Sequence, residues 1–84
     1  MFAVNRRAFL VYDGVMKISA RNVLKGRVVK LVDGAVNCEV TLEISPGIEI
    51  VSMITKASVE SLGLAVGGQA YAVIKASSVM VAVE

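Results

Sequence analysis

The chain has 84 residues, of which 56% are hydrophobic and 19% are charged, and its formal net charge is +2. This length allows one domain with a small core, and so weak a positive charge does not indicate a nucleic-acid surface. The sequence contains no histidine and one cysteine, which removes the commonest general base and the usual ligands of a transition-metal cation. We therefore expect a binding protein, not an enzyme, and no site for a bare metal cation.

The apolar fraction is larger than the core of so short a chain can hide. Exposed apolar patches usually mark interfaces, so we expect a homo-oligomer. The single cysteine, Cys38, excludes an intramolecular disulfide and fits a reducing, cytoplasmic compartment. No apolar run approaches the roughly 20 residues that a membrane span needs, so no membrane association is expected.

Residues 1–15 are predicted to form an N-terminal extension, followed by one domain over residues 16–84. The pair Arg6–Arg7 and the apolar residues after it resemble a twin-arginine export signal. However, Asp13 and Gly14 interrupt the apolar stretch, and no small-residue cleavage site follows it. We interpret the extension as an extra strand or an arm.

Strand patterns dominate the first part of the predicted domain. Gly26–Val32 is rich in β-branched residues, and the turn residues Asp33 and Gly34 follow it. Val36–Ile44 alternates apolar and polar residues with the period of two that a half-buried strand shows. Ser45–Gly47 predicts a second turn, after which Ile48–Thr55 is the next expected strand.

One short helix is predicted after these strands. Ser58 can cap a helix that begins at Val59 and ends at Leu62, where Gly63 is suited to a left-handed stop. Thr55 is a competing candidate for the N-cap.

The remaining residues predict two further strands. Gly67 and Gly68 form a turn, Gln69–Ala76 is a strand, and Val79–Val83 is expected to be the last strand. The sequence thus predicts an all-β fold, a small OB-like (oligonucleotide/oligosaccharide-binding) barrel of five or six strands with one short helix. Such barrels avoid open sheet edges by closure or by pairing with another chain.

Two carboxylates are the simplest candidates for catalysis. Glu39 and Glu43 share a strand face with Asn37 and Thr41. Because that whole face is polar, we interpret it as the solvated outer side of a hairpin and not as a catalytic pair.

Two short segments collect hydrogen-bond donors without any carboxylate, namely Ser19-Ala20-Arg21-Asn22 and Lys75-Ala76-Ser77-Ser78. Considered singly, Arg21 is explained as a surface arginine and Lys75 as a guard on an edge strand. Together they offer what a tetrahedral dianion needs: two cations, hydroxyls, and main-chain N–H groups at Ala20 or Ala76. More than fifty residues separate the segments, so only the fold can bring them together.

The same residues carry a resemblance to a known family. The run from Met16 to Gly26, with Ser-Ala-Arg-Asn at its centre, is similar to the opening of the Mop domain of molbindins. The resemblance spans residues 16–84 and continues through Val40–Ile44, Ile54–Thr55, Ser58–Leu64 and Ala72–Ser77.

This resemblance implies an OB-like barrel that binds molybdate or tungstate as a tetrahedral oxyanion, for storage or homeostasis. It also implies a hexamer that holds oxyanions between its subunits. The family's binding positions fall on Ser19, Arg21, Thr55, Lys75, Ala76 and Ser77, to which the donor pattern adds Ala20 and Asn22.

Three alternatives stay open at this point. The chain resembles the effector-sensing domain of molybdate-responsive regulators and of some molybdate transporters, although 84 residues leave no room for a helix-turn-helix or a P-loop. An OB-type nucleic-acid binder would need an aromatic platform and a stronger positive charge. A molybdopterin-binding protein would need an aromatic pocket for the pterin ring, and the sequence shows no obvious one.

Overall fold

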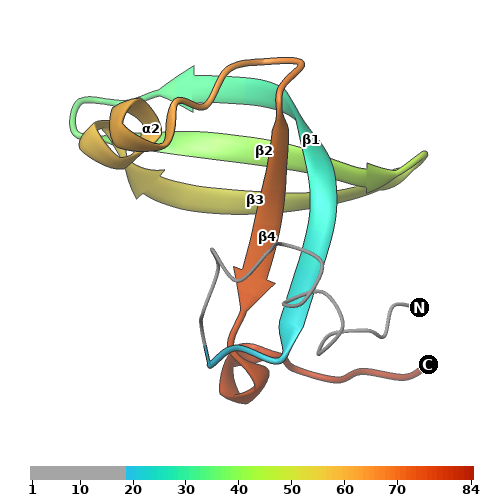
Figure 1. The fold of residues 1–84 in the computed structure, drawn as a ribbon. Coiled ribbons are helices and arrows are strands. Elements are labelled where there is room, and N and C mark those ends of the chain that lie inside the picture. The colour runs from blue at the N-terminus through green and yellow to red at the C-terminus, as the bar shows by residue number, and fades with distance from the viewer. Residues whose placement is uncertain (1–18) are drawn as a thin grey trace. The chain divides into compact units, whose positions relative to one another are not determined.

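The computed structural model of the chain describes residues 19–84. The predicted extension at residues 1–15 therefore lies outside the described residues, as does Met16. Within the described part, no helix is long and apolar enough to cross a membrane. The elements, in chain order (Figure 1), are β1 (Asn22–Asp33), β2 (Asn37–Ser45), β3 (Ile48–Thr55), α2 (Lys56–Leu62), β4 (Gln69–Ile74) and the 3-10 helix η1 (Ala76–Ser78).

The described residues divide into two compact units. One contains residues 19–24 and Val73–Glu84, and the other contains Lys25–Ala72. The strands form one four-stranded sheet with the order β3-β2-β1-β4, so β3 and β4 are its edge strands. Both β1 and β4 contribute residues to both units.

The unit Lys25–Ala72 is built on two antiparallel pairings. In β1 and β2, Arg27 lies opposite Glu43 and Asp33 opposite Cys38, with an irregularity in the register between Val28 and Lys30. In the pairing of β2 with β3, Asn37 lies opposite Thr55 at one end and Ser45 lies opposite Ile48 at the other. The turn between them places Gly47 at a φ of +83°, a backbone conformation that glycine adopts without steric cost. The two predicted turns of the hairpins are thereby confirmed.

The core of this unit lies along the centre of the sheet. Its buried apolar side chains are Val28, Cys38, Val40, Leu42 and Ala72. Burial raises the pKa of the Cys38 thiol above its ordinary value, and the nearby Asp33 carboxylate adds to the effect. The thiol therefore stays protonated at neutral pH and acts as a small apolar core group.

The outer face of β2 differs from the solvated face that the sequence predicts. Thr41 is buried, with 5% of its surface exposed, and Glu39 and Glu43 are half-buried. In the register of the strands, Thr41 lies between Lys30 of β1 and Val51 of β3. Side chains directly opposite each other on neighbouring strands lie close together, so these two flanking residues cover the threonine between them.

The helix is confirmed, and its N-cap is Thr55, the second of the two candidates. The backbone N–H of Ser58 donates to Oγ1 of Thr55 at 3.0 Å, so α2 begins at Lys56. Gly63 ends the helix in the left-handed region, with a φ of +66°. The preference for Ser58 as the N-cap was wrong because both residues suit the role and only the chain direction after β3 distinguishes them.

The two strands predicted at the end of the sequence are corrected by the structure. β4 ends at Ile74, and Ala76–Ser78 turns into η1. Val79–Val83 is extended but belongs to no strand, so residues 19–84 contain four strands and not five or six. The composition of Val79–Val83 favours a strand, but a strand also requires a paired neighbour, which this segment lacks among the described residues.

Gly26 of β1 offers a test of how closely β1 and β2 approach. A Cβ atom at this position would lie 2.8 Å from the carbonyl oxygen of Glu43 and 2.9 Å from Cδ1 of Ile44. We expect Gly26→Ala to lower the free energy of unfolding by about 1–3 kcal/mol, the usual cost of overpacking. Urea unfolding followed by circular dichroism measures the change. Lys25→Ala, at the exposed neighbouring position, should change stability by less than about 0.5 kcal/mol, and equal stability of both variants would contradict the close approach.

Candidate functional site

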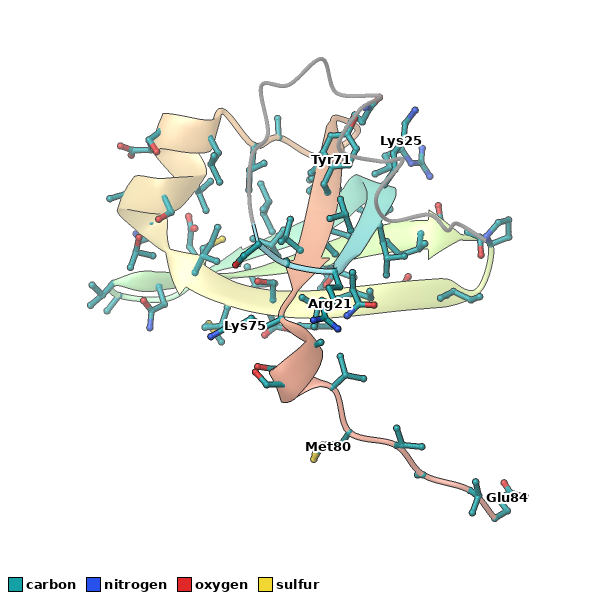
Figure 2. All side chains as sticks on the ribbon, turned by 60° about the horizontal axis from the view of Figure 1, so that its bottom comes forward. Arg21, Lys25, Tyr71, Lys75, Met80 and Glu84 are labelled. Carbon is teal, nitrogen blue, oxygen red and sulfur yellow. The ribbon has the colours of Figure 1, made fainter. Side chains whose placement is uncertain are left out.

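The structure brings the two donor segments together. The side-chain amide of Asn22 donates to the main-chain carbonyl of Ile74, with 3.2 Å between Nδ2 and the oxygen. This hydrogen bond joins the residue after Arg21 to the residue before Lys75, and both segments belong to the same compact unit. Figure 2 shows the side chains of Arg21 and Lys75 at the same place, where the chain leaves β4 and enters η1. The predicted approach of the two segments is therefore a feature of the fold.

The turn after Lys75 orients main-chain donors. Lys75 is extended and precedes η1, whose first hydrogen bond runs from the N–H of Ser78 to the carbonyl of Lys75 at 2.9 Å. In a helix with this bonding pattern, the amides of Ala76 and Ser77 lie before the first helical bond. They therefore lie before the first hydrogen bond of η1 and directly after Lys75 in the chain. The sequence predicted that the strand continues to Ala76 and breaks at Ser77–Ser78, whereas in the structure the turn already begins at Ala76.

The electrostatics of the cluster are one-sided. The described residues of this unit include one acidic residue, Glu84. Figure 2 shows Glu84 well away from Arg21 and Lys75. The ion pair found within residues 19–84 joins Arg27 to Glu43 at 3.0 Å, in the other unit. Arg21, Lys75, Ala76 and Ser77 are exposed, as is Ser19, whereas Ala20 is buried. Among the described residues of its own unit, the cluster thus presents two positive charges and several donors, and the acidic side chain there is that of Glu84.

Asn22 is the half-buried member of the predicted set. One of the N–H groups of its amide is used by the carbonyl of Ile74. Its observed role is to hold the start of β1 to the end of β4, which is a positioning role that the donor pattern alone did not indicate.

Thr55 belongs to the other unit, Lys25–Ala72. Its Oγ1 lies 2.9 Å from Oγ of Ser58 and accepts the N–H of Ser58. The hydroxyl is therefore occupied as the N-cap of α2. Its predicted role as an oxyanion ligand stays a prediction. Elsewhere in residues 19–84, no group of three acidic or cysteine side chains is arranged to hold a metal cation.

Comparison with known proteins adds independent information. Residues 18–81 match the model of the TOBE domain. A probable molybdenum-pterin-binding protein of Haemophilus influenzae is 54% identical over 69 residues, which cover 82% of this chain and all of the relative.

Two solved structures are also similar to the chain. MopII from Clostridium pasteurianum has 49% sequence identity and a TM-score of 0.74, over 80% of this chain and all of that one. The cytoplasmic molybdate-binding protein ModG, in a form with molybdate bound, has 52% identity and a TM-score of 0.71, over 76% of this chain and 45% of that one. These likenesses confirm the OB-like fold class and the resemblance to Mop proteins.

The observed cap gives a prediction for Thr55. Thr55→Ala removes the acceptor for the N–H of Ser58, so we expect the free energy of unfolding to fall by about 1 kcal/mol. Thr55→Ser keeps the hydroxyl and should retain most of the stability. Thermal unfolding of both variants without any anion measures this effect. An alanine variant as stable as the serine variant would show that the cap contributes nothing.

Proposed function

The chain belongs to the TOBE-domain family, among the molybdenum-pterin-binding (Mop) proteins, and from this membership we propose that it binds molybdate at the cluster around Arg21 and Lys75. The observation that carries the proposal is the hydrogen bond from Asn22 to Ile74, because it holds the two cationic segments at one place. A tetrahedral dianion is the ligand class that such a cluster suits. The relatives are named as binding proteins, and we propose a binding role without catalysis.

The chemistry of the cluster matches an oxyanion in three respects. Arg21 and Lys75 supply two positive charges for a dianion, and charge-assisted hydrogen bonds are the strong ones. The hydroxyls of Ser19 and Ser77 and the amides of Ala20 and Ala76 supply further donors for the remaining oxygen atoms. In an oxyanion the metal is already surrounded by oxygen atoms, so the protein has to supply hydrogen-bond donors and not lone-pair ligands. A chain without histidine can therefore bind it. Tungstate has the same shape and charge and is expected to bind in the same way.

A molybdenum-pterin compound is a second candidate, which the names of the relatives favour. A pterin ring would need an aromatic or apolar surface to stack on. Residues 19–84 contain one aromatic side chain, that of Tyr71. It belongs to the unit Lys25–Ala72, and its hydroxyl oxygen lies 2.8 Å from Nε2 of Gln69. A tetrahedral oxyanion needs no ring to stack on, so we favour the free oxyanion.

We propose further that the protein works as a homo-oligomer in the cytoplasm, as a store of molybdate. Large apolar side chains are exposed on the unit Lys25–Ala72, including Val32, Val51, Met53, Leu62 and Val66. Such surface is typical of an interface. The resemblance to Mop proteins implies six copies, with oxyanions between them. The location is supported by the likeness to ModG, which is described as cytoplasmic.

Anion selectivity is the first test of the proposed function. We expect molybdate and tungstate to bind more tightly than sulfate, because donors spaced for a larger anion cannot all close on a smaller one, and unmade bonds to desolvated donors are costly. Phosphate should also bind weakly, because it carries a proton at neutral pH that meets donors instead of acceptors. Isothermal titration calorimetry with the four anions and with a pterin measures this order. Equal affinity for sulfate and molybdate would refute the assignment, and preference for the pterin would favour the second candidate.

The two cations give the second test. We expect Arg21→Ala and Lys75→Ala each to weaken molybdate binding by about 10- to 100-fold, the equivalent of one charge-assisted hydrogen bond. The control variants are Lys25→Ala and Lys30→Ala, which remove exposed lysines from the other unit and should bind as the wild type does. Titration of the four variants in one buffer separates a site effect from a loss of general positive charge. Wild-type affinity in both Arg21→Ala and Lys75→Ala would rule out this cluster.

A further inference from the structure

Ser78 carries a hydroxyl that the proposed molybdate site does not use. It ends the second donor segment, whereas the binding positions implied by the resemblance to Mop proteins end at Ser77. Ser78 is exposed and lies in the same unit as Arg21 and Lys75. Among residues 19–84, no hydrogen bond engages its hydroxyl. Within the described part of the chain, this hydroxyl therefore has its donor and its acceptor lone pairs left for a ligand.

Ser78 lies at the open end of the turn that follows β4. Its backbone N–H donates to the carbonyl of Lys75 at 2.9 Å, which closes a turn of four residues. In such a turn the first and last Cα atoms lie within about 7 Å of each other, whereas the two middle residues form the tip. Ser78 is therefore beside Lys75, and Ala76 and Ser77 are at the tip.

The open end of this turn is the end held to the first donor segment. The amide of Asn22 donates to the carbonyl of Ile74, the residue before the turn, at 3.2 Å. Asn22 follows Arg21 directly in the chain, and Figure 2 shows Arg21 and Lys75 at the place where β4 ends. The turn thus brings the chain back, at Ser78, to the place of the two cations.

A neutral donor at this place complements the two cations. Arg21 and Lys75 together carry two positive charges, which match the charge of a dianion, so a third cation would leave an excess. A serine hydroxyl donates one hydrogen bond without adding charge. A hydrogen bond to a charged acceptor is also stronger than one between neutral groups. A hydroxyl is therefore suited to an oxygen atom of the dianion that the cations leave open.

We propose that Ser78 is a further binding residue of the oxyanion site, whose hydroxyl donates to an oxygen atom of the dianion held by Lys75. The inference rests on the proposed function and adds a position to it. Lys75 then supplies charge and Ser78 supplies direction, from the two residues that meet at the open end of one turn. The hydrogen bond that closes the turn fixes the spacing between them.

The first experiment removes the hydroxyl alone. We expect Ser78→Ala to weaken molybdate binding by about tenfold, the lower range for a hydrogen bond to a charged group. Ser78→Thr keeps the hydroxyl and should bind more tightly than Ser78→Ala. The matched control is Ser61→Ala, which removes the hydroxyl of an exposed serine of α2, in the other unit, and should bind as the wild type does. Isothermal titration calorimetry in one buffer measures all four proteins.

The outcomes of this titration separate the two proposals. A wild type that binds molybdate and a Ser78→Ala variant that binds it equally well would overturn the role of Ser78 and leave the proposed function standing. A wild type that does not bind molybdate would refute the proposed function, and the role of Ser78 with it.

The second experiment distinguishes direct contact from an effect on the fold. Since no hydrogen bond within residues 19–84 uses the Ser78 hydroxyl, Ser78→Ala should unfold at the wild-type temperature when no anion is present. A double-mutant cycle with Lys75→Ala gives a readout that a structural role would not move. Two groups that hold the same anion are coupled, so the loss caused by Ser78→Ala should be smaller when Lys75 is already replaced. Additive losses, or a loss of affinity together with a lower unfolding temperature, would overturn the proposal.

Discussion

The hydrogen bond between the amide of Asn22 and the carbonyl of Ile74 joins two segments that lie 52 positions apart in the sequence. Together with the place of β4 beside β1 in the sheet, it brings together Arg21 and Lys75, each of which considered singly has an ordinary surface explanation. A neutral amide is well suited to this task, because it donates to a carbonyl without adding a charge of its own. The positive field of the cluster therefore remains available to a ligand.

The small size of the chain links its function to its surface. A core that consists mainly of Val28, Cys38, Val40, Leu42 and Ala72 leaves much of the apolar sequence outside. Larger proteins would bury such residues within one chain, whereas a short chain has too little interior to hold them. The exposed Arg27–Glu43 pair adds little by comparison, since ion pairs at the surface are screened by water.

Local patterns in the sequence predicted the parts of the fold that depend on neighbouring residues. Strand β3 was predicted with its observed bounds, and so was the stop at Gly63, because alternation and left-handed backbone are properties of a few adjacent positions. The approach of the two donor segments was expected from chemistry and family resemblance, and the structure supplies the contact that produces it.

The errors in the sequence-based predictions concern features that depend on more distant partners. Thr41 was expected to be solvated because its own strand face is polar, but Lys30 and Val51 on the neighbouring strands cover it. Val79–Val83 was expected to be a strand, yet pairing requires a second strand that no local pattern specifies. The positioning role of Asn22 was missed for the same reason, because its acceptor is a main-chain carbonyl that any residue type can provide.

The uncompensated charge of the donor cluster has a thermodynamic consequence. Arg21 and Lys75 belong to one unit, whose described residues include one carboxylate side chain, at Glu84. The two cations repel each other at a cost that water and salt reduce but do not remove. A bound dianion would replace this repulsion with attraction and would act as an internal counter-ion of the folded chain. A ligand that binds only the folded state stabilises it in proportion to the logarithm of the ligand concentration once the site is nearly full. On the proposed function, the stability of the folded chain would therefore rise with the supply of oxyanion.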